Sequence, residues 1–165
     1  MKNPTDACVV AFYPFPRGLG FSVFYGADTP IDWGVRRSRR WSKAKCIDKV
    51  AEILDYYQPD TIVLEHFDSS DSRRSLGAQH TVEALATFAD NQGYAVIRLS
   101  KRAVQDVFVQ YSCASKYDIA HCIQIWLPEF GSVLPPKRKR WDREDYRMTI
   151  FSSAALALTY FYTNS

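Results

Sequence analysis

The sequence predicts an α/β domain built in layers around a mixed sheet, with the element order β-β-β-α-β-α-β-α-α-α. Three observations predict it. Residues 8–35 are short apolar runs separated by turn residues, which is typical of an antiparallel meander. From Ser42 onward the apolar residues change to helical spacing. The β-branched run at residues 61–64 stops at the carboxylate of Glu65, which indicates a buried central strand ending at a ligand-binding edge.

The first three strands are expected at residues 8–13, 19–25 and 31–35. The proline-rich segment 14–18 turns the chain after the first strand, and residues 26–30 turn it after the second. These turns make the three strands an antiparallel meander.

Helices and strands then alternate. A helix from Ser42 covers the sheet with its apolar face, and residues 58–60 end it before the strand at 61–64. A second helix is expected at 76–91, followed by a strand at 94–99.

Three helices complete the chain. Ser100 and Ser115 are suitable N-caps for the first two, and the last helix is expected from about Asp142. With 165 residues, of which 47% are apolar, the chain is long enough for one compact domain with a full core.

Positive charge is unevenly distributed along the chain. The formal net charge is only +3, but basic residues crowd the segments 36–45 and 137–140. Such clusters on a nearly neutral chain suggest a surface that faces a polyanion. Either cluster alone fits a solvated loop equally well.

Cysteine spacing and hydropathy indicate the cellular compartment of the protein. The four cysteines lack CxxC spacing, which argues against a zinc site. Cys8, Cys46 and Cys122 lie in expected strands and helices, which is typical of reduced, buried thiols. The first residues lack a signal-peptide pattern, and the longest uncharged stretch, residues 149–165, is too polar to span a bilayer. We expect a cytoplasmic protein without a membrane partner.

Four segments carry a resemblance to a known family: VVAFYPFPRGLGFSVFYG, TIVLEHF, SKYDIAHCIQIWLPE and EDYRMTIFSSAALALTYF. In this order they resemble the RNase H-like fold, and more narrowly the RuvC-type Holliday junction resolvases and their bacterial and phage-type relatives. The resemblance covers nearly the whole chain. It implies a single RNase H-like domain over residues 1–165, with three layers and a mixed five-stranded sheet carrying helices on both faces.

In such nucleases, carboxylates hold two Mg²⁺ or Mn²⁺ ions roughly 4 Å apart. The resemblance places these acids on the first strand, the fourth strand and the last helix. Glu65 matches the fourth-strand acid, but Tyr13 stands at the first-strand position and Ser152 at the last-helix position. Asp145 is the candidate upstream ligand, on the same expected helix face as Ser152 and about 10 Å of helix rise from it. The candidate catalytic residues are therefore Glu65, Asp145, Tyr13 and Ser152, and the candidate metal ligands are Glu65 and Asp145.

Other assignments stay open at these positions. An acid such as Asp145 in a first helical turn is also stabilised by the helix dipole. Asp68 or Asp71 could complete the acid set, although both are typical loop acids. Tyr13 as a covalent nucleophile lacks a cluster of activating arginines beyond Arg17.

Basic and aromatic residues are the expected nucleic-acid contacts, because lysine and arginine neutralise phosphates and aromatic rings stack on bases. Trp41 and Trp141 each lie in or next to a basic run, where they are either stacking platforms or packed aromatics. The resemblance adds Lys116, and implies DNA as partner and a homodimer. The candidate binding residues are Arg17, Arg36, Arg37, Arg39, Arg40, Arg73, Arg74, Lys116, Lys137 and Arg138.

The sequence therefore favours a resolvase-like nucleic-acid-binding protein in which two-metal phosphodiester hydrolysis is impaired or lost. One alternative is an active Mg²⁺- or Mn²⁺-dependent, structure-specific DNA endonuclease using Glu65 and Asp145. Another is a protein-interaction or assembly factor on the same fold. The cofactor is Mg²⁺ or Mn²⁺ in the active case and none otherwise.

Overall fold

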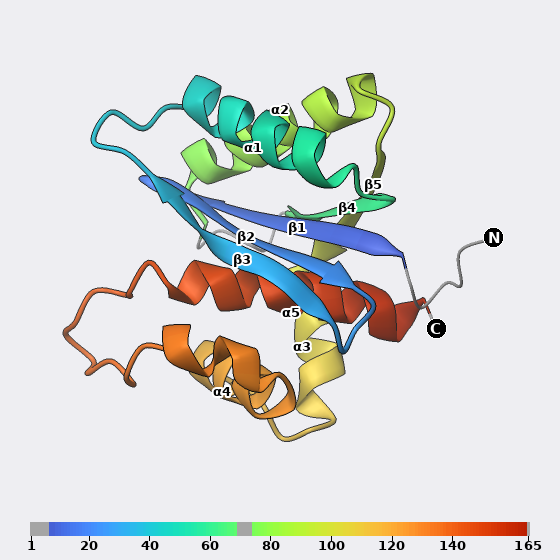
Figure 1. Ribbon diagram of the computed structural model, residues 1–165. Coiled ribbons are helices and arrows are strands. Elements are labelled where there is room, and N and C mark those ends of the chain that lie inside the picture. The colour runs from blue at the N-terminus through green and yellow to red at the C-terminus, as the bar shows by residue number, and fades with distance from the viewer. Residues whose placement is uncertain (1–6, 69–73, 165) are drawn as a thin grey trace.

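A computed structural model describes residues 7–68 and 74–164 (Figure 1). Five strands form one mixed sheet in the spatial order β3-β2-β1-β4-β5. The antiparallel part consists of β1 (Cys8–Phe15), β2 (Gly18–Tyr25) and β3 (Pro30–Arg37). β4 (Thr61–His66) lies between β1 and β5 (Ala95–Ser100) and runs parallel to both. The predicted meander and the predicted central strand are both confirmed.

Helices cover both faces of the sheet (Figure 1). One face carries α1 (Lys43–Tyr57) and α2 (Leu76–Asn91). The opposite face carries α3 (Lys101–Val109), α4 (Lys116–Trp126) and α5 (Met148–Thr163). The three-layer α/β architecture expected from the sequence is thus confirmed. No helix within the described ranges is long and apolar enough to cross a membrane.

Serine side chains begin four of the helices. Ser42, Ser75, Ser100 and Ser115 each accept a hydrogen bond from the backbone N–H three residues further on. Such a bond satisfies one of the backbone donors that a helix start leaves without a partner. The predicted helix starts at Ser42, Ser100 and Ser115 are confirmed.

The start of the last helix differs from the prediction. α5 begins at Met148, not near Asp142. The carboxylate of Asp142 accepts the backbone N–H of Lys139 at 3.2 Å, and that of Asp145 accepts the backbone N–H of Arg147 at 2.9 Å. These acids therefore stabilise turns, which compete with helix formation for the same backbone groups.

Alternate residues of β1 and β4 belong to two separate cores. Val9, Ala11 and Val63 pack on the α5 side of the sheet, whereas Val10 and Ile62 pack on the α1–α2 side. Period-two alternation sends successive side chains to opposite faces. The side chains on the α5 side at the carboxyl ends of these strands are therefore the ones that can form a site there.

α5 approaches the sheet closely. The helix is apolar nearly all round because it lies between the sheet and the layer of α3 and α4 (Figure 1). At Gly20 of β2, an added Cβ would lie 2.4 Å from Thr149 Oγ1 and 2.6 Å from the Thr149 carbonyl carbon. Further along, the Ser153 hydroxyl lies 3.1 Å from that of Ser22. Small residues at these contacts bring α5 against β1 and β2.

Candidate functional site

The carboxyl ends of β1 and β4 open into a cavity of about 640 Å³ on the α5 side of the sheet. Ala11 pairs with Val63 across these parallel strands. Tyr13 and Glu65, each two residues further along, therefore face the same side next to one another. Ser152 of α5 lines the same cavity. The structure thus brings three of the four candidate catalytic residues together.

A guanidinium faces the Glu65 carboxylate in this cavity. Arg74 Nε lies 3.2 Å from Glu65 Oε1, and the exposed fractions of the two side chains are only 19% and 8%. Arg74 also donates from Nη2 to the Pro14 carbonyl at 2.7 Å, and its Cζ lies 4.2 Å from the ring centroid of Tyr13. A carboxylate, a carbonyl oxygen and an aromatic face together fix the position of this guanidinium.

Further cations surround the pair. Lys116 Nζ lies 5.4 Å from the Tyr13 ring centroid and forms an ion pair with Glu144. Among the residues lining the cavity, four cations face two carboxylates: Arg74, Lys101, Lys116 and Arg138 against Glu65 and Glu144. A cavity with this excess of positive charge attracts phosphate groups.

The donor set does not fit the two-metal centre that the resemblance implies. Mg²⁺ and Mn²⁺ prefer several carboxylate oxygens, because these offset the cost of removing water from the ion. Here Glu65 is paired with Arg74, the other carboxylate of the cavity, Glu144, is paired with Lys116, and Tyr13 and Ser152 add only neutral side chains. The Ser152 hydroxyl donates to the Met148 carbonyl at 3.2 Å. Within the described part of the chain, no group of three or more His, Cys, Asp or Glu side chains is placed to hold a metal ion.

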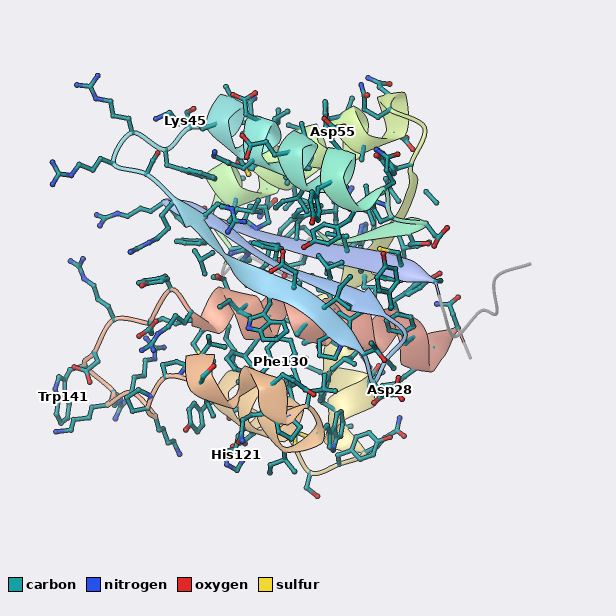
Figure 2. The ribbon with its side chains drawn as sticks, in the orientation of Figure 1. Asp28, Lys45, Asp55, His121, Phe130 and Trp141 are labelled. Carbon is teal, nitrogen blue, oxygen red and sulfur yellow. The ribbon has the colours of Figure 1, made fainter. Side chains whose placement is uncertain are left out.

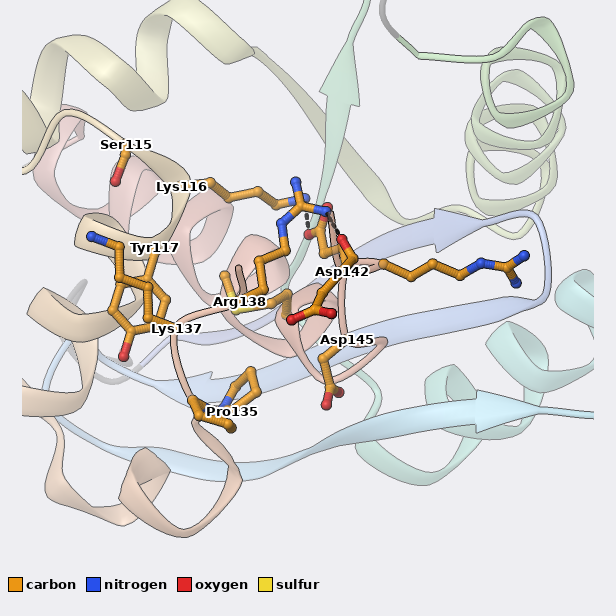
Figure 3. Close-up of a pocket in the computed structure, with 12 residues that line it drawn as sticks. Ser115, Lys116, Tyr117, Pro135, Lys137, Arg138, Asp142 and Asp145 are labelled. Carbon is orange, nitrogen blue, oxygen red and sulfur yellow. Dashed lines mark hydrogen bonds and ion pairs between the residues drawn. The ribbon is translucent and has the colours of Figure 1, made fainter. Parts of the chain in front are cut away.

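Asp145 lines a neighbouring cavity of about 540 Å³, not the one that contains Glu65 (Figure 3). Its carboxylate points away from Lys116 and Arg138, which extend toward the other end of that cavity (Figure 3). Arg147 donates to it from Nε at 3.0 Å and from Nη2 at 2.8 Å. These bonds lower the pKa of the Asp145 carboxyl. The expectation that Asp145 and Ser152 share a helix face is wrong, because Asp145 precedes α5.

The Asp145→Asn variant is expected to lose less stability than the unmodified chain on acidification. Because Arg147 lowers the folded-state pKa of Asp145, the pair stabilises the fold above the unfolded-state pKa of about 3.9. That stabilisation is lost as the pH falls through the folded-state pKa. The effect is small, since the two side chains are 33% and 37% exposed and water screens the pair. Urea unfolding over a series of acidic pH values measures the free energy of unfolding of both proteins. Plots of this free energy against pH that run parallel for the two proteins would contradict the prediction.

The predicted basic residues occupy several places. Lys116 and Arg138 line the Tyr13–Glu65 cavity, and Lys137 lines the neighbouring one. Arg74 also lines the Tyr13–Glu65 cavity, whereas five members line neither cavity: Arg17 in the β1–β2 turn, Arg36 and Arg37 at the end of β3, and Arg39 and Arg40 after it. Arg73 and Asp71 lie outside the described residues, and Asp68 Oδ1 lies 3.2 Å from His66 Nε2.

Two further charged residues line the cavity, and neither is among the predicted site residues. Lys101 begins α3 directly after β5, and Glu144 precedes α5. The position of Lys101 could have been inferred, because it directly follows a predicted strand and the carboxyl ends of parallel strands meet at one edge of a sheet. In the structure His66 of β4 pairs with Ser100 of β5, which places Lys101 at that edge. Glu144 has no comparable signal, since its position depends on the turns before α5.

No protein-family model and no curated protein matches this chain, but solved structures do. RuvC of T. thermophilus in complex with a Holliday junction substrate matches with a TM-score of 0.66 at 17% identity, over 96% of this chain and 95% of that one. The chain has the fold of RuvC. The yeast mitochondrial Holliday junction resolvase matches with a TM-score of 0.60 at 13% identity, over 96% of this chain and 80% of its own. Fowlpox virus resolvase, solved with Holliday junction DNA, matches with a TM-score of 0.56 at 14% identity, over 95% of this chain and 98% of its own. The RuvC-like fold expected from the sequence is thereby confirmed, while identities this low carry no residue roles from those proteins to this one.

Proposed function

We propose that this chain binds nucleic acid through the cationic cavity and the basic segments beside it, and that it does not hydrolyse phosphodiesters by a two-metal mechanism. The Glu65–Arg74 ion pair supports the proposal most strongly. In a two-metal nuclease the fourth-strand carboxylate is available to divalent ions, whereas here a guanidinium of the same chain lies against it.

The charges of the cavity favour a phosphate ligand. The side chains of Arg74, Lys101, Lys116 and Arg138 all line one cavity. Charge-assisted hydrogen bonds from such groups to phosphate oxygens are strong, and they need no bridging metal. Binding is therefore expected without divalent ions and with a strong dependence on salt concentration.

The neighbours in fold suggest which nucleic acid to test first. Two of them were solved with Holliday junction DNA, so a four-way DNA junction is the first substrate of choice. DNA rather than RNA, and a homodimer, remain predictions from the resemblance.

The test compares binding and cleavage of four-way, flap and linear DNA of matched sequence. We expect equal affinity in EDTA and in Mg²⁺, affinity that falls steeply with salt, and no nicking in Mg²⁺ or Mn²⁺. Metal-dependent nicking that the Glu65→Ala substitution abolishes would instead support the active endonuclease. Absence of salt-sensitive binding to any nucleic acid would support a protein-interaction factor.

A further inference from the structure

An exposed tryptophan projects from the basic connection that precedes α5. Trp141 is 79% exposed, and Figure 2 shows it at the outer end of this loop, directed away from the sheet and the helices. By contrast, Trp41 packs against the core on the α1–α2 side. A large aromatic ring normally buries most of its surface, so a ring held in water points to a partner.

Hydrogen bonds between the residues before and after Trp141 close the turn that carries it. The Asp142 N–H donates to the Lys139 carbonyl at 2.9 Å, and the Lys139 N–H donates to the Asp142 carboxylate. Arg138 Nη1 donates to the Asp142 carbonyl at 3.1 Å. The backbone that carries the ring is therefore held in a defined turn, and Lys139 Nζ lies 5.7 Å from the ring centroid. A backbone ordered before binding reduces the entropy lost when a partner binds.

Positive charge surrounds the ring. Residues 137–147 contain six lysines and arginines and three acids. In the part of the chain that the structure describes, Lys137, Lys139 and Arg140 take part in no ion pair. An aromatic ring among unpaired cations matches the chemistry of single-stranded nucleic acid, in which phosphates and base faces alternate.

This turn is continuous with the cavity. Arg138 lines both the Tyr13–Glu65 cavity and its neighbour, and Asp142 lines the neighbour. On the other side, Arg37 Cζ lies 3.6 Å from the ring centroid of Tyr146, which brings the basic end of β3 next to the same connection. The two basic segments, about a hundred residues apart in sequence, thus form one edge of the molecule (Figure 2).

We infer that Trp141 stacks on an exposed base face of the nucleic acid that the cationic cavity holds. The inference rests on the proposed function and narrows its substrate to nucleic acid with accessible base faces, such as single strands and branch points. A continuous duplex offers phosphates to the cations but no base face to the ring.

The experiment measures the affinity of the Trp141→Ala and Trp141→Phe variants for a single strand, a four-way junction and a linear duplex. For Trp141→Ala we expect about a tenfold or greater loss on the single strand and the junction, and an unchanged affinity for the duplex. Trp141→Phe retains most of the affinity. The matched control is Tyr56→Ala, which removes an 80% exposed aromatic ring from α1 on the opposite face of the sheet.

Salt dependence separates stacking from charge. Trp141→Ala removes no cation, so the slope of log affinity against log salt stays that of the unmodified chain, whereas Arg140→Ala lowers its magnitude by about 0.7–0.9. Equal affinity of Trp141→Ala and the unmodified chain for every substrate overturns the inference and leaves the proposed function standing. An equal loss on duplex and single strand also overturns it. Failure of the unmodified chain to bind any nucleic acid overturns the proposed function and the inference with it.

Discussion

Replacing Glu65 by glutamine is expected to lower the free energy of unfolding by about 3 kcal/mol, because it leaves a mostly buried guanidinium without its counter-charge. Arg74 is only 19% exposed, and its Nη2 already donates to the Pro14 carbonyl. A cluster of metal-binding acids behaves in the opposite way. Without its ions such a cluster repels itself, so removing one charge stabilises the fold.

Two variants control for this result. The double variant Glu65→Gln/Arg74→Met removes both charges, so the loss is expected to be much smaller than for Glu65→Gln alone. The Glu83–Arg98 pair, with a carboxylate that is 63% exposed, is the surface comparison, and Glu83→Gln is expected to cost less than about 1 kcal/mol. Urea unfolding in EDTA measures all three. A Glu65→Gln variant as stable as the unmodified chain, or more stable, contradicts the pairing.

Replacing Gly20 by alanine is expected to destabilise the fold by about 2–3 kcal/mol. The new methyl group would lie within 2.6 Å of the Thr149 carbonyl carbon, so the backbone of α5 must move. Gly20 pairs with Tyr13 across β1 and β2, and Ser152 follows Thr149 on α5. The displacement therefore also separates the two neutral residues of the cavity.

The control for this substitution is Gly77→Ala in the first turn of α2. There an added Cβ meets only Ser75 Oγ, at 3.9 Å. Alanine in a helix is favoured over glycine, so this variant is expected to gain about 0.5–1 kcal/mol. Thermal and urea unfolding of both variants test the contrast, and a Gly20→Ala protein with unchanged stability would show that α5 does not press on β2.

Much of the fold follows from local patterns. The continuous apolar, β-branched run at 61–64 predicted β4. The change to helical spacing at Ser42 predicted the start of α1, and Ser100 and Ser115 predicted the starts of α3 and α4. The start of α5 was misread because acids before an apolar run are typical of a first helical turn. Here Asp142 and Asp145 hold turns through hydrogen bonds to backbone N–H groups, which composition does not reveal.

The site was only partly predictable. Glu65 follows from its place at the end of an apolar strand, and the resemblance pointed to Tyr13 and Ser152. The Glu65–Arg74 contact has no sequence signal, because the two residues come from a strand and from the chain just before α2, and tertiary structure alone brings them together. Arg74 was expected to contact phosphate near the site, and its pairing with Glu65 is what distinguishes this cavity from a metal centre.

The central claim is that a guanidinium of this chain, instead of divalent ions, neutralises Glu65. Calorimetric titration with Mn²⁺ tests it most directly, on the unmodified chain and on the variant Tyr13→Asp/Ser152→Asp/Arg74→Ser, with Tyr13→Asn/Ser152→Asn/Arg74→Ser as the uncharged control. The claim predicts saturable Mn²⁺ binding only in the variant that restores two acids and removes the guanidinium. Saturable Mn²⁺ binding by the unmodified chain that Glu65→Gln abolishes would contradict it.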